Sequence, residues 1–211
     1  MNVLFGGCYK LKEIKGLDKF KTNKVTSMEG MFANCKELEY LDLSNLDTSN
    51  VIKMRDMFSG CNKIKEIKGI NKFKTNKVTS MKGMLDECNS LKSIDVSNID
   101  TSNVINLDDM FYKCIKLKEI KGLDKFITNK VTSMEGMFAY CEELEYLDLS
   151  NFDTSNVIYM NHLFAGCDKL KEIKGLNKFN TKKVKNMAGL FSGCKELEYL
   201  DLSNFDTSNL I

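Results

Sequence analysis

Eight cysteines recur through this chain of 211 residues at nearly constant intervals. They stand at positions 8, 35, 61, 88, 114, 141, 167 and 194, so the intervals alternate between 27 and 26 residues. After each cysteine the apolar positions return in the same order, C-x-x-[IL]-x-x-[IL]. A fixed period of this size is the signature of a repeat protein, whose units bury their apolar faces only by stacking on one another.

Two kinds of unit alternate along the chain. Units of 27 residues begin with CYKLKEIKGLDKF at Cys8, and units of 26 begin with CKELEYLDLSNLD at Cys35; the extra residue lies near the Gly of KGL. Residues 8–34 and 114–140 are identical at 24 of 27 positions, which indicates duplication of a pair and a true period of 53 residues. No linker interrupts the pattern, so we predict a single solenoid domain over residues 1–211, with incomplete units at both ends.

Each unit is predicted to contain a short strand and a short helix. The spacing L-x-x-L-x-L in LEYLDL is that of a leucine-rich repeat strand, with alternate side chains facing a core. Val25, Met28, Met31 and Phe32 are spaced like one side of a helix, and Thr26-x-x-Glu29 fits a capping box at its start. Because crossover connections are right-handed, we expect a right-handed α/β leucine-rich repeat solenoid of about eight repeats, with a parallel sheet on one face and short helices on the other.

The same frame also resembles a known family. The phrase LDLSNFDTSNV at residues 147–157, together with M-F-x-x-C-x-x-L, resembles BspA-like leucine-rich repeat surface proteins over essentially the whole chain, here with 26- and 27-residue repeats. The resemblance implies a location at the cell surface or outside the cell, and a role in adhesion to host or neighbouring cells. The chain itself carries no signal peptide, anchor motif or transmembrane run, so the location comes from the resemblance alone.

The cysteine column has three possible roles: disulfides, metal ligands or core. Equivalent side chains in a stack point the same way and not at each other, which disfavours disulfides. Metal sites need clustered thiolates or histidine partners, and neither occurs. We therefore predict buried free thiols, since free cysteine is among the most buried residue types.

Three further columns are predicted to be structural. A Met and Phe column at helical spacing is expected to be core, as is a mainly aromatic column that includes Phe73 and Phe126. A threonine column that includes Thr48 and Thr154 is expected to satisfy loop backbone groups through local side-chain bonds.

Composition excludes several functions. The chain has 31 basic and 29 acidic residues, so no single-sign field favours nucleic acid or an anionic membrane. The chain has a single histidine, which excludes histidine-based triads and most zinc sites. This residue, His162, lies at a position that varies among the repeats, and we expect it to be exposed. No phosphate loop, paired-carboxylate cleft or nucleophile with a base is present, so we predict no enzyme activity, no cofactor, no metal and no membrane insertion.

The outward strand positions carry the candidate ligand-binding face. One column alternates in charge at every step, from Lys15 and Asp42 onward, and such pairs across adjacent strands favour the register. A solvated, charge-paired face would explain this column. Tyrosines in the neighbouring column favour a protein-binding face, because Tyr is enriched at interface hot spots. The candidate residues are Glu13, Lys15, Tyr40, Asp42, Glu66, Lys68, Asp95, Glu119, Lys121, Tyr146, Asp148, Glu172, Lys174, Tyr199 and Asp201.

The two ends of the array suggest a structural alternative. The chain begins inside a helix segment and stops after a strand and turn, so neither end is capped in the way that solenoids require. Either the chain is a piece of a longer array, or copies associate head to tail, a heterologous contact that produces filaments. The candidate end-to-end contacts are Leu4, Phe5, Leu200, Leu202, Phe205, Leu210 and Ile211.

Overall fold

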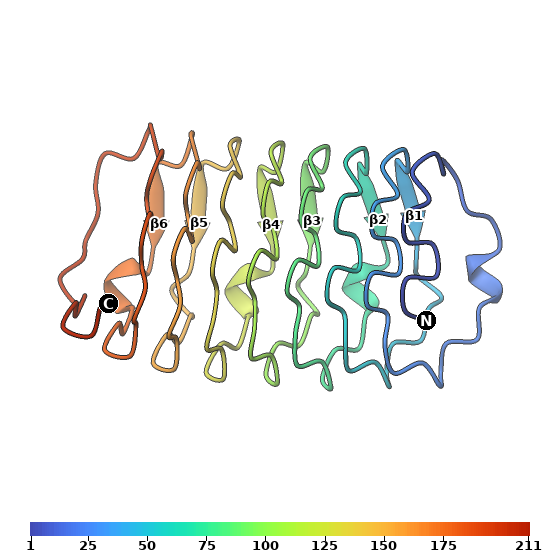
Figure 1. The fold of residues 1–211 in the computed structure, drawn as a ribbon, viewed down its shortest axis with the longest axis horizontal. Coiled ribbons are helices and arrows are strands. Elements are labelled where there is room, and N and C mark those ends of the chain that lie inside the picture. Colours follow the sequence, from blue (N-terminus) through green and yellow to red (C-terminus); the bar gives the residue numbers. More distant parts are fainter.

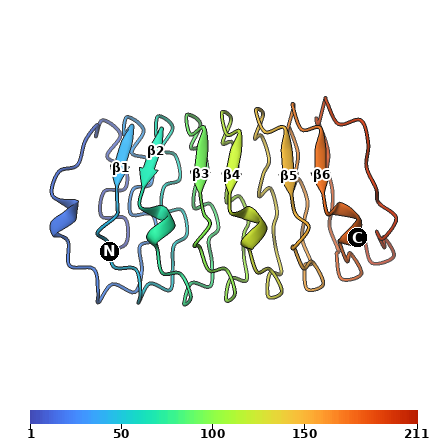
Figure 2. The same ribbon diagram turned by 180° about the vertical axis from the view of Figure 1, so that it is seen from behind.

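A computed structural model describes residues 1–211 as one elongated stack of similar coils, with the chain ends near opposite ends of the stack (Figure 1). Six short strands lie side by side along one edge, and four single-turn 3₁₀ helices follow the first predicted strand segment and every second strand (Figure 2). The strands are β1 (Tyr40–Asp42), β2 (Glu66–Lys68), β3 (Ser93–Asp95), β4 (Glu119–Lys121), β5 (Tyr146–Asp148) and β6 (Glu172–Lys174). The 3₁₀ helices are η1 (Leu17–Lys19), η2 (Ile70–Lys72), η3 (Leu123–Lys125) and η4 (Leu176–Lys178).

The strands pair in parallel, two by two, and not as one continuous sheet. β1 pairs with β2, β3 with β4 and β5 with β6, with Leu41 opposite Ile67 in the first pair. Each pair joins a 26-residue unit to the 27-residue unit that follows it. The predicted strand positions in the first and last units, residues 11–15 and 197–201, form no paired strand.

The helices predicted on the far face do not form. In their place, the segments after the strands make tight turns that hydrogen-bond to the next unit. The Met28 N–H donates to the Lys53 carbonyl (3.0 Å) and the Gly30 N–H to the Arg55 carbonyl (2.9 Å), while the Met31 N–H closes a three-residue turn on Met28 (3.1 Å). Some N–H groups of this segment thus donate to the next unit and others close the local turn. Isolated parallel β-bridges join successive units along this face.

Left-handed backbone positions explain why no helix can form there. Gly30 has φ 59° and Asn34 has φ 60°, four residues apart, and the same two positions are left-handed in the other units. A right-handed helix cannot pass through such residues. The spacing of three, three and one that suggested a helix is equally satisfied by consecutive turns, so the helix prediction and its capping box were wrong.

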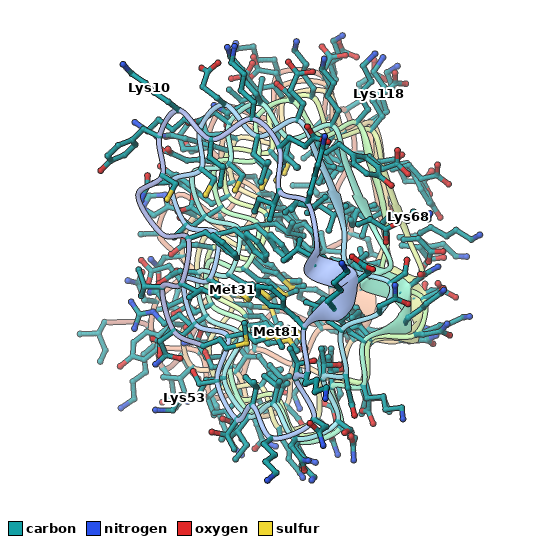
Figure 3. The ribbon with its side chains drawn as sticks, turned by 90° about the vertical axis from the view of Figure 1, so that its right-hand side faces the viewer. Lys10, Met31, Lys53, Lys68, Met81 and Lys118 are labelled. Carbon is teal, nitrogen blue, oxygen red and sulfur yellow. The ribbon has the colours of Figure 1, made fainter.

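The stack encloses one hydrophobic cluster of 55 buried residues. Met31 and Met81 point into it (Figure 3), and Phe32 and Phe58 stack at 5.7 Å between ring centroids. All eight cysteines are free and six are buried, which confirms buried thiols for those six; Cys8 is exposed and Cys194 half-buried.

Each buried thiol points along the axis of the stack. The Cys61 Sγ donates to the Phe32 carbonyl of the preceding unit (3.2 Å), and the other buried cysteines repeat this contact. Burial raises the pKa of Cys61 to about 12, so this thiol stays protonated. The column stabilises the stack without disulfide or metal.

The threonine column also joins successive units. Thr48 is buried, and its Oγ1 both accepts from the Lys74 N–H (2.7 Å) and donates to the Lys74 carbonyl (3.2 Å). Thr154 does the same with Asn180 (2.7 and 3.1 Å). The prediction that these threonines satisfy loop backbone groups is confirmed, but the bonds reach the next unit and are not local.

Candidate functional site

The outward side chains of the strands form one face, which we call the strand face. In five of the six strands the central residue is buried, and in β4 it is half-buried; the two neighbours of each central residue are exposed or half-buried. Figure 3 shows Lys68 and Lys118 on this side of the stack and Lys53 on the opposite side. Tyr40 and Tyr146 are each 46% exposed and Tyr199 is 76% exposed, so the three predicted anchors are all accessible to solvent on one face.

Ion pairs form at every second step of the alternating charge column. Lys68 contacts Asp42 (2.9 Å), and the equivalent pairs in the other two-stranded sheets are Lys121 with Asp95 (4.0 Å) and Lys174 with Asp148 (3.0 Å). No ion pair joins Lys68 to Asp95 or Lys121 to Asp148, although the sequence predicted both. Lys15 contacts Glu13 of its own segment (3.7 Å).

The glycine of the longer unit explains this two-by-two arrangement. Gly122 follows β4 with φ 86°, and a Cβ added there would lie 2.2 Å from the Cα of Ser97 in the preceding unit. The chain therefore approaches the preceding unit as only glycine allows and then turns into η3. Gly69 and Gly175 make the same approach to Ser44 and Ser150.

The longer unit, which contains β4, does not pair with the unit that follows it. No backbone hydrogen bond joins β4 to β5, and the hydrogen bonds between the two units come from residues before and after these strands. Before the strands the Glu143 N–H donates to the Ile115 carbonyl (3.2 Å), and after them the Asp153 N–H donates to Thr128 Oγ1 (2.8 Å). Between these contacts the strand face opens.

An open pocket of about 280 Å³ occupies the boundary between β4 and β5. Ile120 and Leu123 contribute apolar surface, while Glu119, Tyr146 and Asp148 contribute its polar and aromatic surface. Pockets of about 250 and 230 Å³ recur at two equivalent boundaries, one before β1 and one after β6. Their matching residues are Glu13, Ile14, Leu17, Tyr40 and Asp42 in the first and Glu172, Ile173, Leu176, Tyr199 and Asp201 in the last.

The boundary between β2 and β3 differs from the other three. Ser93 stands where they have tyrosine, and the Asn71 side chain of η2 donates to Asp95 across the boundary (3.1 Å). This hydrogen bond, after the stronger ones from Ser97, contributes to the lowered pKa of Asp95. The structure thus brings each predicted tyrosine to the edge of a pocket and leaves the serine boundary bridged.

The strand-face carboxylates fall into two groups. Asp42 accepts the Ser44 N–H (3.0 Å) and contacts Lys68, and these interactions lower the pKa of Asp42 to about 2. Asp148 has the same surroundings, and its pKa is likewise lowered to about 2. Glu119 belongs to the second group, with Glu66 and Glu172, because these side chains form no ion pair in the structure.

The predicted end residues lie at the two ends of the stack and do not meet within one chain. Phe5 packs on Phe32 at 5.4 Å between ring centroids, and Phe205 packs on Phe179 at 6.4 Å. Leu4, Leu202, Leu210 and Ile211 are exposed, whereas Phe5, Leu200 and Phe205 are partly buried against the core.

The turn side carries a polar cluster that the sequence did not indicate. Asp108 is buried and accepts from the Ser133 hydroxyl and from the Glu135 N–H (3.0 Å), with Lys82 at 3.5 Å. Nearby, burial raises the pKa of Asp86 to about 6. No group of three or more His, Cys, Asp or Glu side chains is arranged to hold a metal ion.

The sequence predicted that the tyrosines lie on the outward side of the strands, where Tyr40 and Tyr146 are exposed, but it did not predict the pockets. The available signal was the extra residue at the Gly of KGL, which marks the unit that bends towards its predecessor. His162 lies on the turn side and is exposed, as predicted, with φ 57°.

Comparisons with known proteins identify a family and similar solved structures. A family model described as "Mycoplasma protein of unknown function, DUF285" matches residues 1–121 and 115–211. A leucine-rich repeat protein of T. pallidum is 21% identical over 82% of this chain and 70% of its own, with a TM-score of 0.54. A leucine-rich cell surface protein of Faecalibacterium prausnitzii is 17% identical over 93% of this chain and 67% of its own, with a TM-score of 0.46.

A leucine-rich repeat protein of Eubacterium ventriosum is 18% identical, and this chain spans 41% of its length, with a TM-score of 0.45. No curated protein matches the sequence. None of the helices has the length and apolar character needed to cross a membrane. The resemblance to BspA-like leucine-rich repeat proteins is confirmed, and the T. pallidum structure supports it at the level of the fold.

Proposed function

The chain belongs to the DUF285 family of Mycoplasma proteins of unknown function and folds as a leucine-rich repeat solenoid, and from these premises we propose that it is a non-catalytic interaction module that binds protein ligands through the strand face. One observation carries the proposal: three exposed tyrosines lie on this face, each at the edge of a pocket of similar composition. Aromatic side chains beside small pockets are typical of interface hot spots.

The location and role that we propose follow from the resemblance to BspA-like surface proteins. The module is exposed at the cell surface or outside the cell, where it contributes to adhesion by binding a protein of a host or neighbouring cell. Neither nucleic acid nor membrane insertion is part of this proposal, because the charges of the chain nearly balance.

A bead assay tests the proposal. Fluorescent beads coated with the protein are counted on cultured animal cell monolayers, with and without trypsin treatment that strips cell-surface proteins. A variant with Tyr40, Tyr146 and Tyr199 replaced by Ser is expected to reduce adhesion at least about fivefold, because hot-spot residues carry most of the binding energy. Tyr159→Ser is the matched control, since Tyr159 is similarly exposed (45%) on the turn side.

The melting temperature of each variant shows that the fold is intact. Equal adhesion of the triple variant and the wild type, or adhesion that survives trypsin treatment, contradicts binding of a protein through the strand face.

A second candidate function is structural, by head-to-tail stacking of copies into a filament. Exposed apolar side chains at both ends of the described stack, such as Leu4 and Leu202, favour it. Replacing Leu202 and Leu210 by Lys is then expected to abolish any assembly seen in light scattering or electron microscopy. A wild-type protein that stays monomeric at all concentrations rules out the filament.

A further inference from the structure

The pockets of the strand face are suited to one kind of side chain. Beside Tyr146 the pocket combines an apolar floor at Ile120 and Leu123 with the carboxylates of Glu119 and Asp148. A lysine or arginine side chain has matching parts, because its methylene stem packs on apolar surface while its charged end contacts carboxylates and aromatic faces.

Ion pairing between the strands leaves Glu119 available at this pocket, whereas Asp148 is already paired with Lys174 (3.0 Å). Lys121 and Lys174, the lysines of β4 and β6, are both bound to aspartates of the preceding strand. Lys118 lines the pocket, but its Nζ lies 3.6 Å from Glu143. Glu119 and Glu172 have no ion-pair partner in the structure, so the unpaired charge at these two pockets is negative.

The tyrosine rings are available too. Elsewhere in the molecule, Lys36 lies over the ring of Tyr9 (5.5 Å) and Lys113 over the ring of Tyr112 (5.1 Å). None of the three strand-face tyrosines has a cation over its ring. The protein thus forms cation–π contacts at other tyrosines and leaves open those beside the pockets.

The spacing of the pockets constrains the shape of a ligand that fills several of them. Neighbouring boundaries are two units apart, which is about 10 Å at the usual spacing of about 4.8 Å that the continuous bridges of the turn side keep from unit to unit. An extended β-strand turns successive side chains to opposite faces, so residues three apart point in opposite directions. A polyproline II segment has three residues per turn and rises about 3.1 Å per residue, so every third side chain points the same way at intervals of about 9 Å.

Given the proposed function, we propose that the strand face binds an extended basic segment of a partner protein in the polyproline II conformation, with a Lys or Arg at every third position. Successive cationic side chains enter the pockets beside Tyr146 and Tyr199. The side chain that enters the pocket beside Tyr40 is six residues from the one that enters the pocket beside Tyr146, because the boundary at Ser93 lies between these two pockets.

Labelled peptides test this inference by fluorescence anisotropy. The probe is a twelve-residue peptide of four Pro-Ala-Lys repeats, and the comparison peptide has the same composition with its four lysines contiguous. The wild type is expected to bind the repeating peptide about tenfold more tightly than the contiguous one, because only the former places lysines at successive pockets.

Paired variants locate the site. Glu119→Gln with Glu172→Gln is expected to weaken binding of the repeating peptide about three- to tenfold without lowering the melting temperature, since neither carboxylate has a partner to lose. Tyr159→Ser on the turn side is expected to leave binding unchanged. Ser93→Tyr completes the series of tyrosines and is expected to tighten binding about threefold.

Three outcomes overturn the inference: no binding of the repeating peptide, equal binding of both peptides, or affinity that neither the glutamate pair nor Ser93→Tyr changes. These outcomes are distinguishable from failure of the proposed function. Beads that bind cells through the tyrosines, while the peptides do not bind, leave the interaction module intact and reject only its basic ligand.

Discussion

Replacing Gly122 by Ala tests the close approach that divides the strands into pairs. Gly122 has φ 86°, where a residue with a side chain costs about 1–2 kcal/mol relative to glycine. The new Cβ would also stand 2.2 Å from the Cα of Ser97, whereas ordinary contacts of this kind are 3.4–4 Å. Two backbones would have to separate by more than 1 Å, which costs about 1–3 kcal/mol further by analogy with overpacked cores.

Gly16→Ala is the matched control for this substitution. Gly16 occupies the equivalent position in the first unit with φ 84°, but no heavy atom lies within 4 Å of its added Cβ. It therefore reports the cost of the left-handed conformation without the clash. We expect Gly122→Ala to lower the free energy of unfolding by about 2–5 kcal/mol and Gly16→Ala by about 1–2 kcal/mol.

Urea denaturation followed by circular dichroism measures both losses on the same protein. The difference between them isolates the contact with Ser97, because the backbone angle is shared. Equal losses for the two variants would refute the argument that a close backbone approach holds β4 against β3.

Further predictions concern thiols, pH and the repeat period. With Ellman's reagent, Cys8 is expected to react rapidly in the native protein and the six buried thiols only after unfolding in urea. The urea midpoint is expected to fall as the pH drops from about 4 towards 2, because the pKa values of Asp42 and Asp148 are lowered to about 2 in the folded state and their stabilisation is lost on protonation. Asp42→Asn with Asp148→Asn should flatten that dependence. Insertion of a second copy of residues 114–166 should retain stability, whereas duplicating 114–140 alone should lower the thermal midpoint, since it places two lysine-bearing strands side by side.

Much of the fold could be predicted from the sequence, because the repeat period can be read directly from the spacing of its residues. The cysteine spacing identified the units, and the positions of Leu41 and Ile67 identified the buried side of the strands. The turn side could not be predicted in the same way. Its backbone conformation depends on hydrogen bonds to the next unit, such as that from Gly30 to Arg55, and these are invisible in the pattern of one unit.

The pockets were missed for a related reason. A column of alternating charge suggests a uniform sheet, in which Asp95 would face Lys68 as well as Lys121. The structure pairs Asp95 only with Lys121, because Gly122 draws its unit back towards Ser97. A single extra residue in every second unit therefore decides where the strand face opens, and single-residue differences of this kind are easily averaged away when repeats are aligned.

The serine boundary separates the architecture of the stack from the chemistry of the pockets. Between β2 and β3 the ladder is broken as it is elsewhere, with Gly69 making the same approach to Ser44, yet Ser93 occupies the tyrosine position. The fold therefore tolerates a small side chain there, and stacking does not require a large aromatic ring. Tyr146 is 46% exposed and has no cation or aromatic partner within the chain, so a large part of its ring is free to contact a ligand. The substitution Ser93→Tyr tests whether such contact contributes to binding, at a boundary where the chain lacks the ring.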